Sequence, residues 1–106
     1  MNREPSAAQQ VMGEIAPKFT DLTDKVLFGD IWERKELSKR DRSLITVAAL
    51  VALNRSDQLR FHLQRALENG VKKQELIEEI THLAFYSGWP TAVNALTVAK
   101  EVLSKV

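Results

Sequence analysis

Two histidines are the side chains of this chain best suited to moving protons near neutral pH, and His62 is the more informative of them. In a helix, His62 lies about 60° from Leu59 and about 40° from Ala66, at the edge of an apolar stripe. A histidine at that boundary is either packed and bonded to a backbone carbonyl, or a general acid or base facing a cleft. Residue type and position alone favour the packed histidine.

The second histidine, His82, falls on the polar side of its predicted helix, three residues after Glu79 and four after Glu78. This spacing predicts a surface histidine in local ion pairs. The two histidines lie on different predicted helices, and neither shows the HxxxH or HExxH spacing of a helical metal site. We therefore predict no metal site.

Charged side chains that could bind an anion occur in two places. Arg42 shares one face of an otherwise apolar predicted helix with Thr46, where an arginine either extends to solvent or is held against an anion. Asp30, Glu33 and Arg34 occupy a predicted loop earlier in the chain. By residue type alone, extension into solvent and ordinary loop charges are the favoured interpretations.

Positioning these residues requires helices, and the hydrophobic pattern predicts an all-α fold of about six helices in one domain, residues 1–106. The segments with helical periodicity are residues 6–15, 17–27, 38–54, 57–69, 73–86 and a last helix from about residue 90. Ser38 and Ser56 are predicted to cap helices, and Gly70 fits a left-handed position after a helix.

The expected burial of these segments bears on assembly. Residues 44–53 contain one polar side chain, Thr46, so this helix is predicted to be buried on most sides. Phe61 and Phe85 lie away from the apolar stripes of their helices, which indicates packing under a neighbouring loop or a subunit interface. The last helix is expected to bury one face: Ala92, Leu96, Ala99 and Leu103. The loop of residues 29–37 is expected to turn three side chains inward: Ile31, Trp32 and Leu37.

Composition narrows the class of protein. The formal net charge is +1, and 15 basic side chains are scattered among 14 acidic ones, so no basic tract favours nucleic acid or an anionic membrane. The first ten residues contain no apolar signal core, and the run of residues 47–53 is far shorter than the roughly 20 residues of a membrane span. We expect a cytoplasmic protein with no nucleic-acid or membrane partner.

The chain contains no cysteine, which excludes disulfides, thiolate metal ligands and cysteine nucleophiles. We therefore predict that it does not reduce hydroperoxides through a dithiol cycle. Purified metal-free protein supplied with a dithiol and a hydroperoxide should consume peroxide no faster than a protein-free blank. Sustained turnover above that blank would contradict this prediction.

Four segments in order resemble the carboxymuconolactone decarboxylase family, within the superfamily that also holds the alkyl hydroperoxidase D-like proteins. They are GDIW-x-R, L-S-x-R-D-R-S-L-I-T-x-A-A-L, Q-L-R-x-H-L-x-x-A-L-x-N-G-V and E-L-I-E-x-I-x-H-L-A-x-Y-S-G-W-P-x-A. The resemblance covers residues 19–103 and implies the all-α, alkyl hydroperoxidase D-like fold. It also implies a homohexamer built as a trimer of dimers.

The resemblance also distinguishes branches of the superfamily. The peroxidase branch carries a CxxC pair before its histidine, and here those two positions are Arg55 and Gln58. The chain is therefore similar to the decarboxylase-like branch, which lacks the pair and keeps the histidine. One departure lies in the first segment, where Lys35 and Glu36 replace the Pro-Gly of many members, and this change leaves the substrate open.

The resemblance implies a carboxy-lyase that decarboxylates a small carboxylated lactone in the degradation of aromatic compounds, and such chemistry needs no cofactor in principle. His62 and Asp30 match family positions as catalytic residues, and Arg34 and Arg42 match as substrate-binding residues. Two alternatives stay open: another cofactor-free acid–base enzyme on this scaffold, or an oligomeric binding protein without catalysis. The roles of His82 and Glu33 stay open as well.

Overall fold

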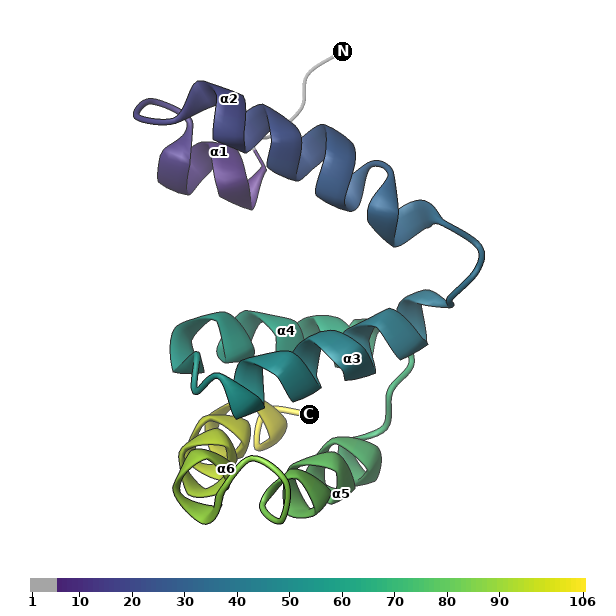
Figure 1. Cartoon of the computed structure of the whole chain (residues 1–106), viewed down its shortest axis with the longest axis vertical. Coiled ribbons are helices and arrows are strands. Elements are labelled where there is room, and N and C mark those ends of the chain that lie inside the picture. Colours follow the sequence, from purple (N-terminus) through teal and green to yellow (C-terminus); the bar gives the residue numbers. More distant parts are fainter. Residues whose placement is uncertain (1–5) are drawn as a thin grey trace. The chain divides into compact units, whose positions relative to one another are not determined.

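The computed structural model describes residues 6–106, and these residues form helices and turns with no β-strand (Figure 1). The prediction of an all-α fold with about six helices is therefore confirmed. The described chain divides into two compact units, one ending at Leu37 and the other formed by Ser38–Val106. None of the helices in the described part is long and apolar enough to span a bilayer.

The N-terminal unit is a series of short helices in which only a few side chains are buried. Its elements are α1 (Ala7–Met12), α2 (Pro17–Leu22), a π-helix η1 (Thr23–Phe28) and a 3-10 helix η2 (Ile31–Glu33). Ser6 caps α1 by accepting a hydrogen bond from the Gln9 N–H at 3.0 Å, and Pro17 opens α2 as predicted. Gly29 ends the π-helix, where a Cβ would lie 2.7 Å from the Lys25 carbonyl oxygen.

The segment after Gly29 buries less than predicted. Trp32 is buried and stacks on Phe28 with a centroid distance of 6.0 Å, whereas Ile31 and Leu37 are 41% and 40% exposed. The inward prediction for Ile31 and Leu37 was wrong. A 3-10 helix turns about 120° per residue, so Ile31 and Trp32 cannot both face the same side.

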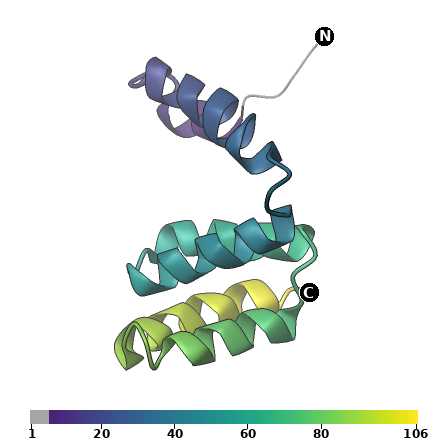
Figure 2. The same cartoon turned by 45° about the vertical axis from the view of Figure 1, so that its right-hand side comes forward.

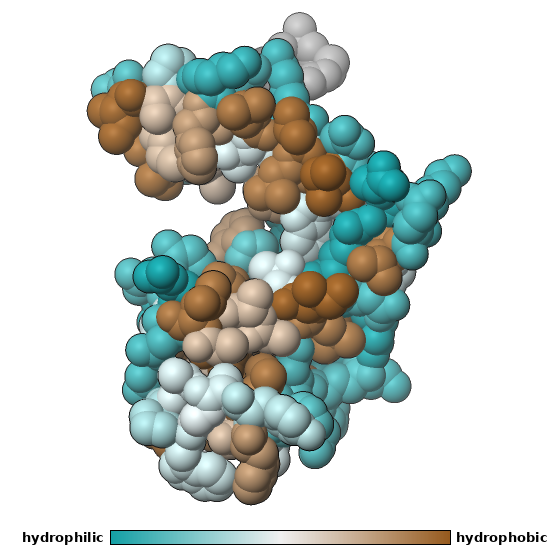
Figure 3. Space-filling model, in the orientation of Figure 1, coloured by the Kyte–Doolittle hydropathy of each residue, from teal (hydrophilic) through white to brown (hydrophobic). Residues whose placement is uncertain are grey.

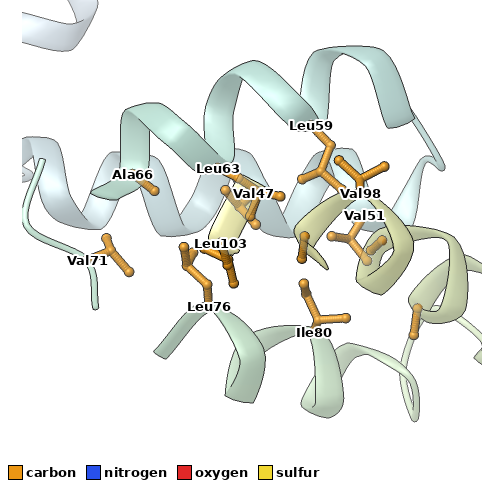
Figure 4. Packing of buried hydrophobic residues seen from close by; sticks show 13 residues of the cluster. Val47, Val51, Leu59, Leu63, Ala66, Val71, Leu76, Ile80, Val98 and Leu103 are labelled. Atoms are coloured by element: carbon orange, nitrogen blue, oxygen red, sulfur yellow. The ribbon is translucent and has the colours of Figure 1, made fainter. Parts of the chain in front are cut away.

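The C-terminal unit is a bundle of four longer helices (Figures 1 and 2): α3 (Lys39–Ala52), α4 (Ser56–Glu68), α5 (Lys73–Leu83) and α6 (Trp89–Leu103). α3 and α6 each pack against both α4 and α5. Apolar side chains at helical spacing from all four helices meet in one core (Figure 4). The most completely buried of these are Val47, Val51, Leu59, Leu63, Leu76 and Ile80.

Two predictions about burial in this unit were wrong. α6 buries Ala95 and Val98 beside Ala92, Ala99 and Leu103, and Leu96 is exposed because it lies about 100° from Ala95 at the edge of this face. α3 buries only one side of its apolar run in the isolated chain, with Ile45 and Leu53 56% and 63% exposed. The reason is that three neighbouring helices can cover only the inner face of α3.

Both ends of α4 are fixed by left-handed residues. Asn54, with φ of 59°, ends α3, and the Arg55 N–H donates to the Leu50 carbonyl at 2.9 Å. Gly70, with φ of 98°, ends α4 as predicted, and the next N–H donates to the Ala66 carbonyl at 2.9 Å. These are the bonds of a Schellman motif. Because Asn54 turns the chain so early, Arg55 is the cap residue and Ser56 already belongs to the helix, which corrects the predicted cap at Ser56.

Candidate active site

His62 is a half-buried side chain in the middle of α4. Its ring meets the Phe61 ring edge-on, with the centroids 5.0 Å apart and the planes at 87°. Burial lowers the pKa of His62 from its ordinary value of 6.5, and the positive charge of Arg65 lowers this pKa further. The imidazole is therefore mostly neutral at pH 7, while remaining close to the range in which it can be charged.

The packing of α4 directs His62 toward α3. Leu59, Leu63 and Ala66 are buried in the core and fix the rotation of α4 about its axis. Asn69, seven residues after His62 and so on the same side of the helix, donates from Nδ2 to Ser43 Oγ of α3 at 3.0 Å. His62 therefore lies on the side of α4 that is next to α3.

Arg42, the predicted substrate-binding residue of α3, directly precedes this contact in sequence. Its side chain is half-buried, and its carbonyl accepts a hydrogen bond from Thr46 Oγ1 at 2.8 Å. The structure thus places Arg42 and His62 on two helices that pack together in one unit.

Asp30 and Arg34, the other predicted site residues, belong to the N-terminal unit. Asp30 is exposed and its carbonyl accepts the Glu33 N–H at 3.0 Å, at the start of η2. Arg34 is exposed and forms an ion pair with Glu36 at 3.6 Å, so the departure at position 36 gives this arginine a local carboxylate partner. The assignment of Asp30 and Arg34 to a site with His62 stays a prediction.

Arg65 is a charged residue next to His62 that sequence reasoning did not single out. Its Cζ lies 5.7 Å from the centroid of the Phe61 ring, and its charge acts on His62. The signal was available, because residues three and four apart on a helix are neighbours and Arg65 follows His62 by three and Phe61 by four. It was missed because Arg65 is not part of the family segments.

His82 and Glu79 belong to α5. His82 is exposed, as predicted, and it stacks on Tyr86 with a centroid distance of 4.8 Å. Glu79 is half-buried, its Oε1 is buried without a hydrogen bond in the described chain, and burial raises the pKa of its carboxyl to about 7. Among residues 6–106, no group of three or more His, Asp or Glu side chains could hold a metal ion.

Known proteins resemble this chain across the region that holds these residues. The profile of the Carboxymuconolactone decarboxylase family matches residues 17–101, which include all four predicted site residues. A 4-carboxymuconolactone decarboxylase of Acinetobacter baylyi is 42% identical over 84 residues, or 79% of this chain and 63% of that protein. A nitrosuccinic acid decarboxylase of Metarhizium robertsii is 29% identical over 84 residues, or 79% of this chain and 59% of that protein.

A third relative has no activity in its name. It is an uncharacterized 15.0 kDa protein of Paracoccus denitrificans, 26% identical over 98 residues, which are 91% of this chain and 73% of that protein. The chain spans 63% and 59% of the two decarboxylases, less than two thirds of their length.

Proposed function

Because this chain belongs to the carboxymuconolactone decarboxylase family, we propose that it is a carboxy-lyase that decarboxylates a small carboxylated lactone without a cofactor. Two relatives with different substrates in their names are both decarboxylases, which supports this reaction class more strongly than any one substrate. A cytoplasmic location and a role in the degradation of aromatic compounds are part of the same proposal.

The proposed reaction makes three demands on the protein. An arginine holds the substrate carboxylate, and the carbon–carbon bond to that carboxylate breaks with release of carbon dioxide. The electron pair moves into the conjugated lactone carbonyl, where positive charge stabilises the developing oxyanion. One proton is then added to carbon, which completes the product. Arg42 and Arg34 are the proposed partners of the anionic groups, and Asp30 is a proposed supporting group.

His62 is the proposed source of the proton, and its environment is the observation that carries the proposal. Burial and Arg65 keep its imidazole mostly neutral in the free protein. A carboxylate bound beside it would favour the imidazolium form, since a nearby opposite charge raises the pKa of a histidine. Substrate binding would thus charge His62 at the moment when a proton is needed.

Incubation with 4-carboxymuconolactone tests this function, with nitrosuccinate as a second substrate. Turnover should release one carbon dioxide per product, and in deuterated water the product should carry deuterium at the carbon that was protonated. Absence of turnover on both compounds would contradict a decarboxylase of these substrates. Turnover of another acid by proton transfer, or binding without turnover, would instead favour the two alternatives named above.

We also propose that the protein forms a homo-oligomer, and most specifically a hexamer. The outer side of α3 and the turn between α5 and α6 expose large apolar side chains, with Phe85 76% exposed and in contact with Trp89 at 5.8 Å (Figure 3). Light scattering at micromolar concentration should give a multiple of 12.0 kDa. A stable 12.0 kDa monomer would contradict the assembly.

A further inference from the structure

One turn of α4 brings together a proton carrier, a cation and an aromatic face. Phe61 is 43% exposed, and its ring has the His62 ring against it at 5.0 Å and the Arg65 guanidinium over it at 5.7 Å. An open hollow of about 270 Å³ lies on this part of the helix. The residues that line it are Phe61, Gln64, Arg65 and Glu68.

We propose that Arg65 binds a carboxylate of the substrate beside His62, while the Phe61 ring contacts the flat unsaturated part of the same molecule. The ligand class is a small, planar, unsaturated carboxylate. This inference rests on the proposed function and adds to it a residue that the family segments do not include. A guanidinium is suited to this role because its planar donors match the two oxygens of a carboxylate.

The geometry also links anion binding to proton transfer. Arg65 lies close enough to His62 for its charge to disfavour the imidazolium. An anion at Arg65 offsets that charge, so it makes His62 easier to protonate, and a protonated His62 in turn strengthens anion binding by the same factor. A substrate carboxylate at Arg65 therefore prepares the acid that the reaction uses.

α4 supplies a matched control for Arg65. Arg60 lies on the other side of the helix and forms ion pairs with Glu101 of α6 at 3.1 Å and with Asp57 at 3.5 Å. Replacing it removes the same charge from the same helix, but away from His62. Arg60→Gln should therefore leave anion binding at His62 unchanged, whereas Arg65→Gln should not.

The test is an NMR titration of the His62 ring with maleate, an unreactive planar dicarboxylate, on wild type, Arg65→Gln and Arg60→Gln. In wild type and Arg60→Gln, saturating maleate should raise the pKa of His62. In Arg65→Gln, the pKa should be higher without maleate, and maleate should bind about 10–100-fold more weakly, as expected when a charged hydrogen-bond partner is lost. Arg65→Lys should recover part of the affinity, and the His82 signal serves as an internal reference.

Each outcome decides the proposal. Equal maleate affinity in wild type and Arg65→Gln would overturn it, as would failure of wild type to bind millimolar maleate. Should Arg65→Gln prove misfolded by circular dichroism, Arg65→Lys provides the comparison, since it keeps the charge but loses the paired donors. Maleate binding needs no turnover, so loss of binding in Arg65→Gln supports the anion site even if the protein decarboxylates neither test substrate.

Discussion

Replacing His62 with glutamine should lower kcat on the true substrate by about 10²–10⁴-fold, the usual contribution of a general acid. The imidazole is the proposed proton donor, and glutamine keeps a similar volume and a hydrogen-bonding group but cannot be protonated at neutral pH. The half-buried position beside Phe61 should tolerate this change, so the unfolding midpoint should stay within a few degrees of wild type. Initial rates and thermal unfolding measure the two effects separately.

His82→Gln is the matched control, because His82 is exposed on a different helix and should keep full activity when replaced. A second readout is the pH dependence of kcat/KM in wild type. Because donation requires the imidazolium, kcat/KM should fall as pH rises through the lowered pKa of His62, below its ordinary 6.5. If His62→Gln kept normal turnover but unfolded at a much lower temperature, His62 would be a packing residue and the catalytic assignment would be wrong.

The stability of the protein should fall by about 2 kcal/mol between about pH 4.5 and about pH 7 because of Glu79. Burial raises the pKa of this carboxyl from 4.5 to about 7, so in that range the folded chain holds a proton that the unfolded chain has released. Unfolding then releases this proton, and rising pH favours unfolding. The full shift corresponds to about 3 kcal/mol, and the exposed part of the side chain reduces the expected effect.

Glu79→Gln should remove most of this pH dependence, so that the variant gains stability over wild type near pH 8 and differs little near pH 4.5. Glu78→Gln is the matched control, since Glu78 is exposed on the same turn of α5. Urea unfolding at fixed protein concentration and a series of pH values measures both variants. An unchanged slope of stability against pH in Glu79→Gln would show that Glu79 is solvated in the protein.

The sequence predicted best those features that depend on a few neighbouring residues. Ser38 accepts the Asp41 N–H at 3.1 Å, Pro17 opens α2, and Gly70 adopts the left-handed conformation after α4, all as expected from local chemistry. Predictions that needed the packing of other helices did worse. Whether Leu96 or Ala95 of α6 is buried depends on where α4 and α5 contact that helix, and one helical pattern allows either choice.

The candidate site divides in the same way. His62 was placed at the boundary of its apolar stripe, and the half-buried ring agrees with that position. Arg65 went unnoticed because its effect depends on the charge and the ring next to it rather than on any motif. The lowered pKa of His62 depends on burial, a property of the packed bundle that residue types alone cannot give.

The π-helix η1 has a consequence for insertions and deletions among relatives. A π turn holds one residue more than an α turn, and here it follows α2 without a break. Deleting one residue between Thr23 and Phe28 would let the segment continue as an α-helix, turning everything after it by about 100° relative to α2. Relatives one residue shorter in this segment should therefore lack the π turn and present the residues at positions 30 and 34 in a different direction. Length at this point is a simple marker for sorting sequences of the family.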